Sequence, residues 1–162
     1  MFTGDSSGDW LFEALHASGF ASQSQALSRD DGLVLRDAYI GAVARCAPPD
    51  NKPSRSEIEA CSEYLQREFD ALRRLRVIIC LGHIAFTATL RLLEARHYAI
   101  PRPRPRFGHQ AEFELQPRER PGAALTLLAS YHPSRQNTQT GRLTRAMWRG
   151  VFRRARTLVG AA

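Results

Sequence analysis

The chain has 162 residues, of which 43% are hydrophobic and 24% are charged, and its formal net charge at pH 7 is +7. No apolar run approaches the roughly eighteen residues that a bilayer-spanning helix needs, so the sequence predicts one globular domain over residues 1–162 and excludes membrane spans, coiled coils and fibres. The three cysteines, an odd number with no signal peptide ahead of them, indicate a reducing, cytoplasmic compartment.

The positive charge comes almost entirely from arginine, because Lys52 is the only lysine in the chain. No acidic residue follows Glu119, whereas arginines are dense over the last quarter of the sequence. This distribution predicts an anionic partner and favours nucleic-acid phosphate. A coding bias toward arginine, together with a solvated helix face, would explain the same excess.

Apolar periodicity and turn residues predict alternating helices and strands. Helices are expected over residues 10–17, 54–75, 83–96 and 143–158. Short apolar runs predict central strands, buried on both faces, over residues 37–44, 76–81 and 124–130. Ser54 and Glu57 have the spacing of a capping box. The alternation indicates an α/β fold with a mostly parallel central sheet.

Two segments do not fit this alternation. Residues 98–109, here called the Pro-Arg loop, contain too much proline for a helix or strand. The chain also opens on a loop and a helix, where such a fold usually begins with an apolar strand. We therefore expect the N-terminal strand to be absent and the domain to be N-terminally incomplete, unless the fold itself starts with a loop.

The last predicted helix separates into two faces at 100° per residue. One face is basic and carries Arg142, Arg145, Arg149, Arg153 and Arg156. The opposite arc is apolar and carries Leu143, Met147, Val151, Ala155 and Leu158. Trp148 and Phe152 flank the apolar arc and are expected in the core. The apolar face is predicted to pack and the basic face to meet solvent or phosphate.

The run at residues 130–144, SYHPSRQNTQTGRLT, follows a predicted strand and precedes the basic helix. Open α/β sheets bind ligands at the carboxyl ends of their strands. His132 stands before Pro133, which restricts its backbone, so a neutral imidazole could donate to a developing anion there. A single histidine in this position is also compatible with a structural role. Core packing does not explain the polar cluster Ser134, Gln136, Asn137, Thr138 and Thr140.

Three motifs carry a resemblance to a known family: HPSxQNTxTGxLT, the opening FTGD, and RCAPPxNKP. In this order along the chain they resemble the uracil-DNA glycosylase superfamily, and within it the iron-sulfur type-b, or family 5, enzymes. The resemblance implies a three-layer α/β/α sandwich. It also implies a DNA repair enzyme that flips uracil, or another deaminated base, out of DNA and hydrolyses its N-glycosidic bond.

The resemblance assigns roles to four residues. Phe2 matches the aromatic residue that stacks on the flipped base, and Asp5 matches the acid that activates or orients the attacking water. Asn51 matches the amide that reads the uracil edge, and His132 matches the histidine that stabilises the departing uracil anion. Singly, each has a plainer reading, since Phe2 could anchor the core, Asp5 could cap a helix and Asn51 could form a turn.

The same resemblance places residues 133–144 in the duplex and the basic helix on the phosphates. The predicted DNA-binding residues are Ser134, Arg135, Gln136, Asn137, Thr140, Arg142, Arg145 and Arg149. DNA containing uracil or a deaminated base is the expected partner. No membrane partner is expected, and the protein is expected to be a monomer.

Cys46 and Cys61 match the third and fourth ligands of a 4Fe-4S cluster in the family, whose first two ligands stand upstream as a CxxC pair. This sequence has no such pair, and it also lacks the family's Gly-Leu-Ala-Pro loop. The cluster is therefore expected to be incomplete or absent in this chain. Cys80 is expected to be a buried, small apolar residue.

Two other functions remain open. A DNA-binding remnant without catalysis would keep the basic loop and helix, and the missing first motif favours it. A nucleotide-binding α/β module would need a glycine-rich phosphate loop after a strand, but neither GxxxxGK nor GxGxxG occurs in the sequence.

Overall fold

The computed structural model describes residues 5–45, 53–118 and 124–160. Phe2, Cys46 and Asn51 lie outside these ranges. The elements, in chain order, are α1 (Ser6–Ala17), α2 (Arg55–Ala71), β1 (Val77–Leu81), α3 (His83–Ala95), β2 (Glu112–Leu115), β3 (Leu125–Ser130), α4 (Arg135–Gln139) and α5 (Arg145–Gly160). None of the helices in the described ranges is long and apolar enough to cross a membrane.

The strands form one small mixed sheet with β3 in the centre. β1 pairs with β3 in parallel, with Leu81 opposite Ser130, and β2 pairs with β3 antiparallel. The strands predicted at 76–81 and 124–130 are confirmed, whereas β2 was not predicted. β3 is buried over most of its length, as expected for a central strand. In β1 only Cys80 is buried, because no described segment pairs with its other edge.

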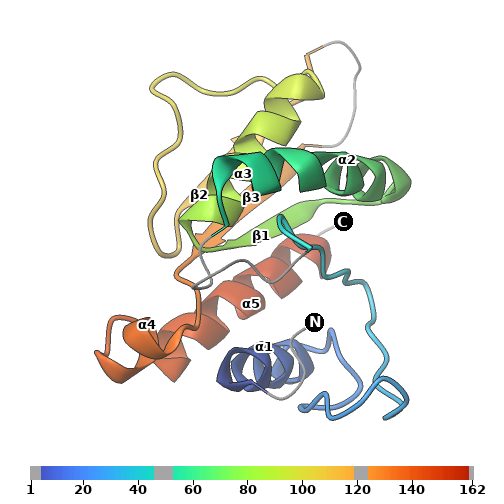
Figure 1. Cartoon of the computed structure of the whole chain (residues 1–162), viewed down its shortest axis with the longest axis vertical. Helices are drawn as coiled ribbons and strands as arrows, with labels where there is room; N and C mark the ends of the chain where they lie inside the picture. The colour runs from blue at the N-terminus through green and yellow to red at the C-terminus, as the bar shows by residue number, and fades with distance from the viewer. Residues whose placement is uncertain (1–4, 46–52, 119–123, 161–162) are drawn as a thin grey trace.

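Alternation along the strands creates two apolar cores, one on each face of the sheet. Leu128 packs into a cluster with residues of α1 and α5, while Leu127 and Ala129 pack with residues of α3. Figure 1 shows α2 and α3 on one side of the strands and α5, with α1 beyond it, on the other. Trp148 and Phe152 are 0% and 2% exposed, which confirms their predicted place in the core. The predicted three-layer α/β/α arrangement is therefore present.

The strand predicted at 37–44 is wrong, because this segment has neither helix nor strand. Its apolar side chains are only half-buried, and Tyr39 is 54% exposed. Side-chain contacts hold it in place of a backbone ladder: the Tyr39 hydroxyl donates to Glu68 Oε1 at 2.7 Å, and Arg45 pairs with the same carboxylate. Asp37 has φ of 52°, which a continuous strand does not accommodate. An apolar run therefore signalled partial burial here, without strand pairing.

Local capping explains where the helices begin. α1 starts earlier than predicted, because Asp5 is its N-cap and Asp5 Oδ1 accepts the Gly8 N–H at 2.6 Å. The capping box of Ser54 and Glu57 opens α2 as predicted. α2 ends at Ala71 instead of residue 75. The short helix α4 was not predicted, and Ser134 caps it.

Candidate active site

A broad open hollow of about 2190 Å³ lies beside β1 and reaches the carboxyl ends of β1 and β3. At that end its lining includes Asp5, Gly82, His83, Phe107, His132 and Arg135. These residues come from α1, the β1–α3 junction, the Pro-Arg loop and the β3–α4 connection. The carboxyl end of a parallel strand pair is where α/β sheets present ligand-binding groups, so the sequence-based location of the site is consistent with the geometry.

His132 is fixed by contacts to its own turn. Asn137 Nδ2 donates to the His132 carbonyl oxygen at 2.8 Å, and Ser7 Oγ donates to the carbonyl oxygen of the buried Pro133 at 3.2 Å. The turn is therefore tied forward to α4 and across the fold to the start of α1. This arrangement restricts where the imidazole can lie at the mouth of the hollow.

Burial lowers the pKa of His132, and the Asp5 carboxylate partly opposes this shift. The imidazole is therefore neutral at pH 7 and can donate one N–H. Asp5 and His132 both line the same hollow. Asp5 is the N-cap of α1, so the plainer reading of this residue is confirmed, and its catalytic role stays a prediction.

Gly82 joins β1 to α3 next to His132. Its amide donates to the Ser130 carbonyl oxygen at 2.8 Å, and its φ of 98° favours glycine. A Cβ added at this position would lie 3.5 Å from the His132 Cβ. Sequence analysis missed Gly82 and His83 as site residues, although a glycine directly after a predicted strand was a usable signal.

His109 supports the same turn from the Pro-Arg loop. Its Nδ1 lies 3.3 Å from Ser130 Oγ and accepts the Tyr131 N–H at 3.4 Å, while its ring stacks on Tyr131 with centroids 5.3 Å apart. Burial lowers the pKa of His109, which favours the neutral form that this acceptor role requires. Nothing in the local sequence distinguished His109, because its partners lie more than twenty residues away.

The polar side chains that follow His132 form hydrogen bonds within their own loop. Ser134 Oγ accepts the Asn137 N–H at 3.4 Å, Thr138 Oγ1 donates to the Ser134 carbonyl oxygen at 3.1 Å, and Thr140 Oγ1 donates to the Gln136 carbonyl oxygen at 2.6 Å. These hydrogen bonds explain why the run is polar, because its side chains stabilise α4 and the residues on either side of it. Contact of Ser134, Gln136, Asn137 and Thr140 with DNA stays a prediction.

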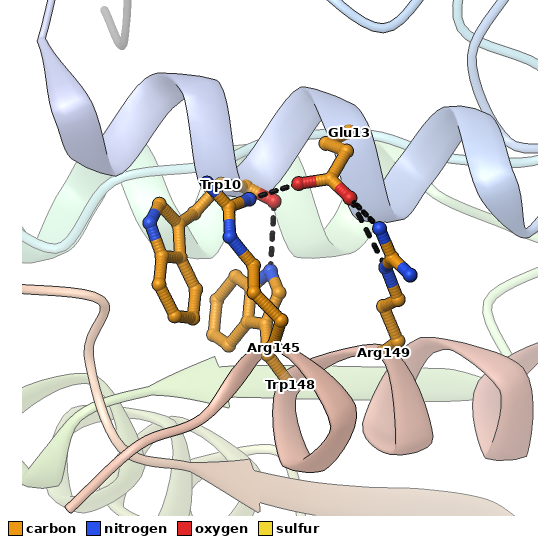
Figure 2. A network of polar contacts seen from close by, with 5 residues as sticks. All are labelled: Trp10, Glu13, Arg145, Trp148 and Arg149. Atoms are coloured by element: carbon orange, nitrogen blue, oxygen red, sulfur yellow. Dashed lines mark hydrogen bonds and ion pairs between the residues drawn. The ribbon is translucent and has the colours of Figure 1, made fainter. Parts of the chain in front are cut away.

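The predicted DNA-binding arginines of α5 lie against α1. Figure 2 shows the Glu13 carboxylate between the guanidinium groups of Arg145 and Arg149, with which it forms ion pairs. The Arg145 guanidinium also lies 4.0 Å from the Trp10 ring centroid, and Trp148 Nε1 donates to the Trp10 carbonyl oxygen at 2.8 Å. This network, here called the Glu13 clamp, holds α1 on α5.

Other α5 arginines are also partnered. Arg154 pairs with Glu112 at 2.7 Å, and Arg156 donates to the Gly19 carbonyl oxygen at 3.1 Å. The basic face is therefore shared between α1, its following loop and solvent, and does not meet solvent alone. DNA contact at Arg145 and Arg149 stays a prediction, in which phosphate would have to compete with Glu13.

The cysteines present do not fit an intact four-thiolate cluster. Cys61 is buried and its sulfur accepts the Arg45 N–H at 3.5 Å, while Cys46 lies outside the described residues. Burial raises the pKa of Cys80 to about 12, so it is a thiol, and it donates to Thr89 Oγ1 at 3.3 Å. Within residues 5–45, 53–118 and 124–160, no three His, Cys, Asp or Glu side chains gather as a metal site. Of the three cysteines in the sequence, Cys46 and Cys61 remain as candidate thiolate ligands, and a 4Fe-4S cluster needs four ligands.

Comparison with known proteins gives one consistent result. Residues 1–156 match the family model of the uracil DNA glycosylase superfamily. A type-5 uracil-DNA glycosylase of Thermus thermophilus is 45% identical over 159 residues, which cover 98% of this chain and 67% of the relative. The corresponding protein of Mycobacterium bovis is 42% identical, with 99% and 56% coverage, and that of Pyrobaculum aerophilum is 39% identical, with 96% and 62% coverage.

Proposed function

The chain belongs to the uracil-DNA glycosylase superfamily, and from this premise we propose that it is a DNA repair enzyme that hydrolyses the N-glycosidic bond of uracil, or of another deaminated base, in DNA. It spans between about half and two thirds of the length of the relatives it matches. The observation that carries the proposal is His132, held neutral at the carboxyl end of the sheet in the same hollow as Asp5.

The proposed chemistry uses these two side chains at opposite ends of the bond that breaks. Cleavage of the bond between the base nitrogen and the sugar carbon leaves negative charge on the base and positive charge on the sugar. The N–H of neutral His132 stabilises the departing base anion, and the Asp5 carboxylate orients water for attack on the sugar carbon. The water supplies a hydroxyl group to the sugar and a proton that the base finally takes up.

Base recognition is assigned to residues outside the described ranges. Phe2 would stack on the flipped base and Asn51 would read its hydrogen-bonding edge, as the family resemblance implies. Extrusion of a base costs a few kcal/mol of stacking and pairing, which contacts to the DNA backbone must offset. Arg135 and Arg142 lie on the lining of the hollow and are suited to such contacts.

We place the enzyme in the cytoplasm as a monomer acting on DNA. The cysteine content supports a reducing compartment, since Cys61 and Cys80 are free thiols. The steps proposed above use only side chains of this chain and water.

A second function, DNA binding without catalysis, is favoured by one observation. No described segment pairs with the outer edge of β1, so the hollow is open along that strand. A pocket lacking one wall would bind DNA through its basic surface and fail to enclose the base.

Single-turnover excision separates the two functions. The protein, in excess over a duplex with one uracil, is expected to release free uracil and leave an abasic site without cutting the strand. A duplex with thymine at the same position is the control. Binding of both duplexes with no release of uracil would support the non-catalytic alternative and contradict the proposed enzyme.

A further inference from the structure

We propose that the Pro-Arg loop, residues 98–109, is a second contact surface for the DNA backbone, on which Arg106, directly before the hollow-lining Phe107, binds a phosphate beside the hollow. The inference rests on the proposed function, because it needs DNA as the partner. It adds a surface that the sequence assigned only to a connecting loop.

Aromatic packing anchors the end of this loop at the site. Phe107 lines the hollow, and its ring meets His83 edge-on with centroids 5.6 Å apart. The same ring packs on Phe86 at 5.7 Å and on Tyr131 at 6.0 Å. Pro105 is buried. The loop is therefore fixed next to the turn that carries His132.

The charged side chains of the loop all lie on the outside. Arg102, Arg104 and Arg106 are all exposed, whereas Pro105 and Phe107 face the protein. Arg104 pairs with Glu94 on α3 at 3.0 Å. Arg102 and Arg106 have no hydrogen bond, ion pair or ring contact with any described residue. Arg106 directly precedes Phe107, which lines the hollow, whereas Arg104 meets Glu94 near the C-terminal end of α3. Of the two arginines of the loop without a partner among the described residues, Arg106 is therefore the one placed at the edge of the site.

The lack of an internal partner distinguishes Arg106 from the arginines of α5. Arg145 and Arg149 would have to give up Glu13 before they bind phosphate, and Arg154 would have to give up Glu112. A cation without an internal partner loses no ion pair when it binds DNA, so its full counterion-release term contributes to affinity. Arg106 is therefore the better phosphate ligand.

The position of the loop fits a contact with the DNA backbone beyond the flipped nucleotide. Figure 1 shows the lower end of the Pro-Arg loop, in yellow, near the connection from β3 to α4. Arg135 at the start of α4 is also exposed and lines the hollow, and its guanidinium has no partner among the described residues. Arg106 and Arg135 thus come from two different segments that both border the hollow. A strand whose base enters the hollow would have phosphates within reach of both segments.

The test is the salt dependence of binding to a uracil-containing duplex. Arg106→Ala is expected to reduce the slope of log affinity against log salt by about one, and affinity near 0.1 M salt by about fivefold. The control Arg29→Ala removes the same charge from an exposed position in the loop after α1, and should leave the slope within about half a unit. Arg106→Lys should restore most of the slope.

The outcomes separate this inference from the proposed function. An unchanged slope in Arg106→Ala, with uracil excision intact in the wild type, would overturn the loop contact and leave the enzyme proposal standing. A reduced slope in a protein that releases no uracil would uphold the loop contact and remove the enzyme proposal. Equal losses in the control variant would show a general charge effect and overturn the loop contact.

Discussion

Glu13 of α1 and Arg149 of α5, 136 residues apart in the chain, are joined at one carboxylate oxygen. Arg149 donates to Glu13 Oε1 through Nε at 3.0 Å and also through Nη2. This contact, with the neighbouring pair to Arg145, lowers the pKa of Glu13. Glu13 therefore links α1, which Asp5 caps, to α5, which follows the loop that carries His132. One acidic residue thus connects the two segments that supply the candidate site.

Removal of the negative charge of Glu13 is expected to strengthen DNA binding. In Glu13→Gln, Arg145 and Arg149 lose their anionic partner, and if they face DNA the salt slope should become steeper by up to about two. Because all three side chains are partly exposed, unfolding free energy should fall by no more than about 1 kcal/mol. Fluorescence anisotropy at several salt concentrations measures the slope. Glu59→Gln, which removes an exposed carboxylate paired with Arg55 on α2, is the matched control. An unaltered slope in Glu13→Gln would exclude both arginines from the DNA interface.

The two roles of Asp5 can be separated by two substitutions. Asparagine keeps a capping oxygen for the Gly8 N–H, whereas alanine removes it. Asp5→Asn should therefore stay within about 0.5 kcal/mol of wild-type stability, while Asp5→Ala should lose about 1 kcal/mol. Uracil release should fall steeply in both variants, since neither retains a carboxylate. Wild-type release by Asp5→Asn would show that Asp5 only caps α1.

Stability should fall as the pH drops from about 6.5 toward 5. Burial lowers the pKa of both His109 and His132, so in this window the unfolded chain binds more protons than the folded one. Each histidine can contribute a slope of at most about 1.4 kcal/mol per pH unit until its folded pKa is passed, below which the loss is complete. Glu13 and Glu112, whose pKa values are lowered, lose their contribution at a lower pH, as pH falls below their unfolded values near 4.3.

Urea denaturation at pH 7.5, 6.5, 5.8 and 5 measures this dependence. The double variant His109→Gln/His132→Gln should have a flatter profile than the wild type. A wild-type profile that is flat between pH 7.5 and 5 would contradict the neutral, buried state of these side chains.

The 162-residue chain by itself is expected to carry no complete iron–sulfur cluster. Cys46 and Cys61 supply two of the four thiolates required, and Cys80 is a protonated thiol in the sheet. Iron analysis and visible absorbance of protein purified without oxygen should give far fewer than four irons per chain. Four irons per chain, lost in Cys61→Ser, would show that other ligands or a second chain complete the site.

Much of the fold could be predicted because short-range patterns dictate it. β1 and β3 were evident as apolar runs, and the capping box at Ser54 marked the start of α2. Residues 37–44 had the same apolar signature, yet a strand also needs a partner edge, which composition does not reveal. β2, only four residues long, was missed for the complementary reason: its pairing with β3 defines it more than its own sequence.

For the candidate site, the sequence located His132 and Asp5 through motifs, and the structure brings both to one hollow. The sequence could not show that Glu13 forms ion pairs with Arg145 and Arg149, or that His109 accepts a hydrogen bond from Tyr131. Those contacts join residues separated by 132, 136 and 22 positions, and they depend on the packed fold. The position of an arginine on a helix face predicts that it is near the surface, and its remaining partners decide whether it is available to DNA.

The central claim, that His132 stabilises the departing base, is tested most directly by single-turnover uracil release from His132→Ala. Loss of one donor to a developing anion should lower the rate about a hundredfold to a thousandfold, which corresponds to roughly 3 to 4 kcal/mol, while affinity for the uracil-containing duplex stays nearly unchanged. His16→Ala, which removes an exposed imidazole from the last turn of α1, should release uracil at the wild-type rate. Wild-type release by His132→Ala would contradict the account.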